Sequence, residues 1–157
     1  MSISLNDAVE LVTLEADLLD DGQFTEWLKL YTQSGFYIIP IDPDADDYAD
    51  TLNYAYDDAE MRQKRVERLI GGRAISAAPP AQTIRLLSRY RLLESDDQRC
   101  VLRCAQLLTE LRQGRERSYA ANVIFTLVKG GDSLKIDQKV IKILGSTEAL
   151  TAVSYIL

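Results

Sequence analysis

The side chains that could carry chemistry in this chain are carboxylates, tyrosines, lysines and two cysteines, because its 157 residues include no histidine. Histidine titrates near neutral pH without perturbation and is the commonest ligand of transition metals. Without it the chain cannot build a Ser-His-Asp triad, a Cys-His pair or a two-His-one-carboxylate iron site. It cannot build a Rieske cluster either, which needs two His and two Cys. The chain therefore works through its remaining polar groups or holds another molecule in place.

The acidic stretch 42–50 is the segment that most suggests a divalent metal. A calcium-binding helix–loop–helix requires Gly at the sixth loop position and Glu at the twelfth. Counted from Asp42, these positions hold Asp47 and Asn53, so the pattern fails. We interpret the stretch as a solvated loop, with a metal site as the minor alternative.

Two other short motifs have structural explanations. Asp57 and Asp58 are adjacent acids that precede a helical pattern, as N-terminal capping residues do. Gly71-Gly72 follows a helical pattern instead of joining a strand to a helix, which predicts a helix end and not a phosphate-binding loop.

Cys100 and Cys104 lie in the stretch 99–111, which alternates like a strand. Residues four apart on a strand are separated by roughly 13 Å, whereas a disulfide needs Cα atoms within about 7 Å. We therefore expect two buried, unbridged thiols. A helical segment would instead make them neighbours and allow a thiol pair.

Three arginines and the single tryptophan are candidates for contacts with a partner. Arg85, Arg89 and Arg91 fall on one side of an alternating stretch, and like charges on one sheet face are costly unless they meet acids or a partner. A subunit contact and a solvated face are equal alternatives for them. Trp27, with Phe24 and Tyr31 at helical spacing, predicts a core position, with an interface anchor as the alternative.

The composition is that of an ordinary folded protein, with 46% hydrophobic and 27% charged residues, and the length fits a single domain over residues 1–157. The net charge of −6 argues against nucleic acid and anionic membranes as partners. No apolar run approaches the roughly 20 residues that span a bilayer. The first residues lack a basic segment followed by an apolar one, so we expect no signal peptide and a cytoplasmic location.

The first half of the chain predicts mostly helices. Apolar positions at helical spacing run from Leu5 to Leu19, with Ser4 or Asn6 as the cap and Asp20-Asp21-Gly22 as the end. A short helix over 24–31, a strand over 35–40, a strand over 53–56 and a charged helix over 59–70 are expected next.

The second half predicts four long strands joined by turns. They are expected over 83–93, 99–111, about 119–127 and 134–144, and the alternation of the last one slips near Gln138-Lys139 in the manner of a bulge. Helices followed by an antiparallel meander indicate the α+β class. The economical arrangement is a curved antiparallel sheet wrapped around the N-terminal helices.

The order of these segments resembles the small β subunit of Rieske-type aromatic-ring-hydroxylating dioxygenases. The likeness covers nearly the whole chain, and its pieces are weak singly but fairly specific together. They are FTEWLKLY (24–31) with GFYIIP (35–40), YDD (56–58) with RVERL (65–69), Pro79-Pro80, Thr83, RLLS (85–88) and AVSYIL (152–157). The chain departs from the family pattern at Ala81-Gln82, where Ser-Arg is usual, and at Arg89, where Asn is frequent. These departures bear on subunit contacts more than on the fold.

The resemblance implies the cone of the cystatin-like, nuclear-transport-factor-2-like superfamily. It also implies a partner, because in this family the large α subunit carries the Rieske [2Fe–2S] cluster and the mononuclear iron. The β subunit is usually structural, in hexamers of three α and three β subunits with a homotrimeric core. The resemblance therefore implies no cofactor, no metal and no catalytic residue in this chain, which agrees with its lack of histidine.

A structural subunit of a dioxygenase active on aromatic compounds is the preferred hypothesis. Its expected contacts with neighbouring subunits are Trp27, Arg65, Arg68, Arg85 and Arg89.

The alternatives are a stand-alone isomerase or dehydratase of the same superfamily and a cone that binds a small apolar ligand without chemistry. The enzyme would use a buried carboxylate base and a tyrosine donor, since a pocket can raise the pKa of a carboxylate into a useful range. Its candidate residues are Asp17, Tyr37, Tyr56 and Glu110. A neighbouring gene encoding Cys-X-His and Cys-X-X-His pairs would favour the subunit.

Overall fold

A computed structural model describes residues 1–75, 81–147 and 156–157, with only the helical backbone for 72–75. The chain opens with α1 (Leu5–Asp20) and α2 (Phe24–Leu28), followed by β1 (Tyr31–Pro40), a 3-10 turn (Tyr48–Asp50), β2 (Asn53–Asp57) and α3 (Ala59–Ile75). Four long strands complete it: β3 (Gln82–Ser95), β4 (Arg99–Arg112), β5 (Arg115–Gly130) and β6 (Ser133–Ile143). Pro79-Pro80 and most of the motif at 152–157 lie outside the described residues.

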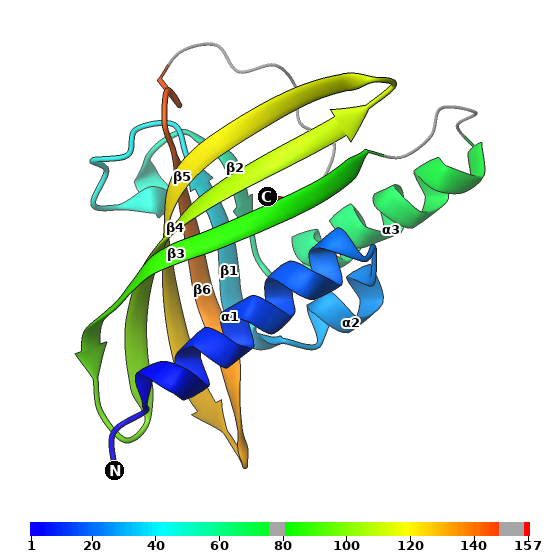
Figure 1. Ribbon diagram of the computed structural model, residues 1–157. Coiled ribbons are helices and arrows are strands. Elements are labelled where there is room, and N and C mark those ends of the chain that lie inside the picture. Colours follow the sequence, from blue (N-terminus) through cyan, green and yellow to red (C-terminus); the bar gives the residue numbers. More distant parts are fainter. Residues whose placement is uncertain (76–80, 148–155) are drawn as a thin grey trace.

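The six strands form one curved sheet in the order β2-β1-β6-β5-β4-β3, and α1 crosses one of its faces (Figure 1). We call the face that carries α1 the inner face and the opposite one the outer face. The expected α+β class is confirmed. The expected curved sheet with an antiparallel meander is confirmed for β3 to β6, and the one difference is that β1 runs parallel to β6 while its other neighbour, β2, is antiparallel. Between β1 and β6 the chain passes through β2, α3 and three further strands, and parallel neighbours require a long connection of this kind.

The first helix forms as its sequence predicts. Ser4 caps it by accepting a hydrogen bond from the amide of Asp7 (3.1 Å), and Gly22 follows its end with a φ of 71°. Its buried side chains are Ala8, Leu11, Val12, Glu15, Ala16 and Leu19. One of these six is a carboxylate, so the inner face must supply partners for a charge.

Two helix boundaries differ from the expectation. The second helix stops at Leu28 instead of residue 31, because Tyr31 already pairs with Ile136 of β6. The third helix does not end at Gly71-Gly72 but continues to Ile75. A glycine inside a helix costs roughly 1 kcal/mol relative to alanine, which weakens the helix without breaking a hydrogen bond.

The four-strand meander places alternate side chains in the core, but three register irregularities interrupt it, two in β3 and one in β6. Arg89 and Tyr90 lie between the paired positions Ser88↔Ala105 and Arg91↔Arg103, and Arg89 has a φ of 55°. A second irregularity of β3 is at Leu93, between the pairs Leu92↔Leu102 and Glu94↔Val101, and β6 has a bulge at Asp137, between the positions that pair with Thr126 and Leu127. The slip expected near Gln138-Lys139 is therefore confirmed within one or two residues.

Both cysteines are free and buried on the inner face of β4, as predicted. Burial raises the pKa of the Cys104 thiol to about 11. They act as small core side chains.

Candidate functional site

The four residues proposed for an enzymatic site do not form one. Asp17 is exposed on α1, and Tyr56 is exposed on β2. Tyr37 is buried and its hydroxyl accepts a hydrogen bond from the Leu157 amide (2.8 Å). Glu110 is buried and accepts a hydrogen bond from Nη2 of Arg117 (3.1 Å). A base and a donor facing a common substrate are therefore not present in this set.

The polar centre of the inner face is Glu15, which the sequence analysis did not single out. Its Oε2 accepts hydrogen bonds from Trp27 Nε1 (3.0 Å) and the Tyr31 hydroxyl (2.8 Å). Its Oε1 accepts one from Lys139 Nζ (2.8 Å). Both carboxylate oxygens are thus used by groups of the chain itself, which leaves neither free to act as a base.

Lys139 reaches the same centre from β6 and is fully buried. Its ammonium also donates to the backbone oxygen of Leu157 (2.8 Å) and lies over the ring of Phe125, 5.6 Å from its centroid. Burial lowers the pKa of Lys139, and the adjacent Glu15 opposes that shift. Burial, with Glu15 beside it, raises the pKa of Tyr31 well above its usual value.

The residues 156–157 occupy the interior above these groups. Ile156 is 1% exposed and Leu157 is 3% exposed. The guanidinium of Arg85 donates to the backbone oxygen of Ile156 and also pairs with Asp20 at the end of α1. Tyr37 and Lys139 hold Leu157 by its amide and its oxygen. The space beside Arg85, Tyr37 and Lys139 is therefore occupied by the chain's own residues 156–157.

Two of the residues proposed for subunit contacts are buried in this interior. Trp27 is 0% exposed, packing against Tyr31 and bonding to Glu15. The side chain of Arg85 is 2% exposed. The arginine face expected on β3 is wrong, because Arg85 points inward while the bulge leaves Arg89 outside.

The other three proposed contacts reach the surface to different degrees. Arg65 of α3 is partly exposed and its Nε bonds to Asp57 Oδ2 at 2.6 Å. Arg68, one turn further along α3, is exposed. Arg89 is exposed on the outer face and donates to Asn122 Oδ1 (3.2 Å).

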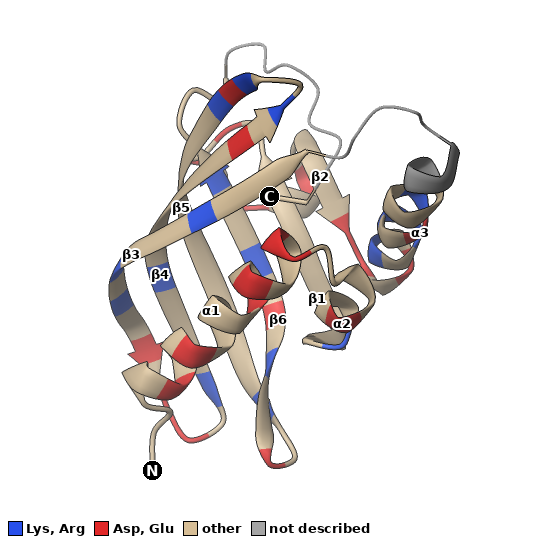
Figure 2. Cartoon of the chain, turned by 45° about the vertical axis from the view of Figure 1, so that its right-hand side comes forward, with Lys and Arg blue, Asp and Glu red and all other residues tan. Residues whose placement is uncertain are grey.

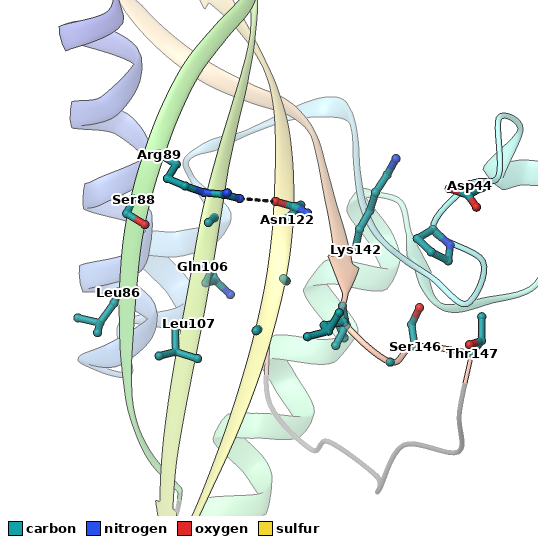
Figure 3. Close-up of a pocket in the computed structure, with 17 residues that line it drawn as sticks. Asp44, Leu86, Ser88, Arg89, Gln106, Leu107, Asn122, Lys142, Ser146 and Thr147 are labelled. Carbon is teal, nitrogen blue, oxygen red and sulfur yellow. Dashed lines mark hydrogen bonds between the residues drawn. The ribbon is translucent and has the colours of Figure 1, made fainter.

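A groove of about 750 Å³ lies on the outer face, across β3 to β6 (Figure 3). Apolar side chains line it on β3 and β4, among them Leu86, which pairs directly with Leu107. Ile84 (64% exposed), Leu86 (61%) and Leu107 (41%) form the stripe that we call the outer apolar stripe. Exposed aliphatic side chains grouped on a sheet face are typical of protein–protein contacts. The site favoured by the geometry is an association surface.

The part of the chain that the structure describes contains no set of side chains placed to bind a metal ion. Within residues 1–75, 81–147 and 156–157, no group of three or more Cys, Asp or Glu side chains is placed to hold an ion, and the sequence has no His. The carboxylates of 42–50 instead bond within their own loop, for example Asp42 Oδ1 to the Asp44 amide (2.9 Å). None of the described helices is both long and apolar enough to cross a membrane.

Glu15 and Lys139 had weak signals in the sequence. Glu15 falls between Leu11 and Leu19 at four-residue steps, on the apolar side of its helix. Lys139 is next to the slip in the alternation of β6. A charge on an apolar helix face requires a buried partner, but the sequence does not say which strand supplies it.

Comparison with known proteins agrees with an association role. Residues 14–148 match the family model described as ring hydroxylating beta subunit. The chain is 27% identical over 139 residues to the small oxygenase component of the p-cumate 2,3-dioxygenase system of Pseudomonas putida, covering 87% of this chain and 77% of that protein.

Solved structures show the same fold. The β subunit of benzoate 1,2-dioxygenase from Burkholderia mallei superposes with a TM-score of 0.82 at 21% identity, over 98% of each chain. A nuclear-transport-factor-2-like protein with a cystatin-like fold from Novosphingobium aromaticivorans gives a TM-score of 0.60 at 15% identity, over 88% of this chain and 80% of that one. The cone-shaped fold expected from the sequence is confirmed.

Proposed function

The chain belongs to the family of ring hydroxylating β subunits, and from this premise we propose that it is the structural, non-catalytic subunit of a dioxygenase that acts on aromatic compounds. The observation that carries the structural role is the filled interior. Of the groups best placed for chemistry there, Lys139 donates to Glu15 and to the Leu157 oxygen, and Tyr37 accepts from the Leu157 amide. The alternative of an isomerase or ligand-binding cone needs that space empty.

The proposed partner is an α subunit that holds the Rieske [2Fe–2S] cluster and the mononuclear iron. Both groups need histidine ligands in that partner, and this chain has none to contribute. The contribution of this chain is then assembly: it covers a face of the α subunit and fixes how copies are arranged. We propose a homotrimeric core within a hexamer of three α and three β subunits. No step of the oxygenation is assigned to this chain.

The exposed residues Arg68 and Arg89 remain the candidates for subunit contacts, with Arg65 as a support for α3 through its ion pair with Asp57. A cytoplasmic location is also proposed, because the two thiols Cys100 and Cys104 are unbridged, as in a reducing compartment.

The test is the native mass and the visible spectrum of the tagged full chain purified from its own cells. We expect a complex of about three plus three subunits with Rieske-type absorbance, and a colourless fraction wherever the chain elutes without a partner. A colourless chain that elutes only as a monomer or dimer would overturn the proposal and return attention to the superfamily's isomerases and ligand binders.

A further inference from the structure

Two arginines face each other directly on the outer face of the sheet. Arg91 of β3 and Arg103 of β4 are paired in register, while the next pair, Leu92 and Leu102, points into the core. Arg89, in the bulge beside them, is exposed on the same side. We call these three residues the arginine cluster. Figure 2 shows basic segments along β3 and β4.

The arginine cluster lacks an acidic partner within residues 1–75, 81–147 and 156–157. None of its three members takes part in an ion pair there, and the buried Nε of Arg103 has no acceptor. Like charges directly opposite each other on neighbouring strands destabilise a sheet. In a chain of net charge −6, such a grouping is best explained by acids that arrive from another molecule.

Acids of this kind are present across the groove. The loop between β1 and β2 carries five aspartates, which we call the acidic loop: Asp42, Asp44, Asp46, Asp47 and Asp50. Its members are exposed, and no lysine or arginine of the described segments pairs with them. Figure 3 shows Asp44 on one side of the groove and Arg89 on the other, with Asn122 and Lys142 between them.

We propose that the outer face is the contact between copies of this chain, with the arginine cluster of one copy against the acidic loop of the next. The proposal rests on the homotrimeric core given above and names the surface that forms it. Because the two clusters differ and lie on opposite sides of one face, each copy offers one cluster to each neighbour. Such a head-to-tail contact closes into a ring of three when each copy is rotated by one third of a turn relative to the last.

The outer apolar stripe lies on the same face as both clusters. Contact between copies would therefore cover Ile84, Leu86 and Leu107 together with the charges. Burial of the apolar side chains supplies most of the affinity, while opposite charges at the rim fix orientation and exclude like-to-like pairing.

Cross-linking in the purified complex tests the contact. The double variant Asp46→Cys/Arg91→Cys is treated with a short bis-maleimide, which alkylates thiols, and the native Cys100 and Cys104 are buried. We expect a denaturing gel to show most of the chain as a three-copy species. The matched control is Asp46→Cys/Arg112→Cys, since Arg112 faces Arg115 across β4 and β5 as Arg91 faces Arg103, but at the hairpin tip. It should stay a single copy.

Other products would overturn the inference. Cross-linking by Arg91→Cys alone would mean a two-fold contact of like clusters, and a product containing the α subunit would mean that this face binds α. A single-copy band from the test variant, within a complex that has normal mass and iron absorbance, would reject the inference while leaving the proposed function intact. Failure to form that complex in the unmodified chain would instead reject the proposed function.

Discussion

At the scale of single residues, the most important feature is the buried ion pair between Glu15 and Lys139, which water cannot reach. Lys139 has no access to solvent, and its neighbours are Glu15, the Leu157 oxygen and the rings of Phe125 and Tyr37. A buried pair of this type gives little net stability relative to apolar residues, but loss of one partner leaves an uncompensated charge. Its effect is to fix how α1, β6 and the end of the described chain meet.

Lys139→Met is therefore expected to lower the free energy of unfolding by about 3–5 kcal/mol, because the Glu15 carboxylate loses its counter-ion in the core. Glu15→Leu combined with Lys139→Met should recover a large part of that loss. Urea denaturation of the three proteins measures both effects. Equal losses for the single and double variants would show that the charge itself does not matter.

Alkaline pH should weaken the folded state through its buried tyrosines. Burial raises the pKa of both Tyr31 and Tyr37, so the folded state keeps protons that the unfolded state releases. This stability is fully present below the unfolded pKa of about 10 and is lost as the pH rises above it. Lys139 acts in the opposite sense, since its lowered pKa makes stability rise with pH, but only up to its unfolded pKa of about 10.4.

The unfolding free energy should consequently fall with pH above about 10.5, where Lys139 no longer opposes the tyrosines and the buried Cys104 thiol, whose pKa is also raised, acts in the same sense as they do. The double variant Tyr31→Phe/Tyr37→Phe should fall with a smaller slope, even though it starts from a lower stability. The measurement is a series of urea denaturations between about pH 9 and pH 12, the range in which buried and exposed phenols titrate. Parallel curves for the two proteins would contradict the explanation.

At the scale of elements, strand pairing and bulges override local preference. Tyr31 has helical spacing in the sequence but pairs with Ile136 as part of a strand. The bulge at Arg89 reverses which side chains of β3 face outward in the residues that follow it. The bulge separates Arg85, which ties Asp20 of α1 to the interior, from Arg89 on the outer face. One extra residue in the strand thus places Arg89 on the exposed outer face instead of in the core.

Helix α3 allows a direct test of how much stability is lost by having a glycine inside a helix. Gly71 has helical backbone, and an added Cβ would meet no atom within 4 Å. Gly71→Ala should raise the stability by about 0.5–1 kcal/mol, because alanine loses less backbone freedom on folding. Gly114→Ala is the matched control: it also has open space, but its φ of +76° should make it destabilising by about 1–2 kcal/mol. Thermal unfolding compares them, and a destabilising Gly71→Ala would show that α3 is not regular at this point.

At the scale of the whole molecule, Glu15 and Lys139 are buried in the core, while the outer apolar stripe is exposed. The interior closes over Glu15 with residues 156–157, while Ile84 and Leu86 remain exposed on the sheet. In the proposed assembly such a chain would gain part of its stability from its neighbours, and its stability would then depend on the concentration of the assembled subunits.

Ile84→Ser combined with Leu86→Ser should weaken subunit association without unfolding the chain, because each fully covered aliphatic side chain contributes about 1.5–3 kcal/mol. Sedimentation of the complex over a dilution series measures this, and circular dichroism checks the fold. Leu52→Ser is the control, since Leu52 is 81% exposed and does not line the outer groove. Equal dissociation in the control would show that the stripe is not part of the contact.

The sequence by itself determined the class of elements and the chemistry that is excluded. Residue types decide which metal ligands exist, so the lack of histidine excludes histidine-based sites directly. Hydrophobic spacing decides which segments are helices or strands, so the first helix, the four long strands and the unbridged Cys100 and Cys104 could be predicted. Only the tertiary structure decided which charge meets which. The Glu15–Lys139 pair joins residues 124 positions apart, and the outward position of Arg89 depends on the bulge in which it lies. Such contacts arise from register and from the parallel entry of β1, which no local pattern encodes.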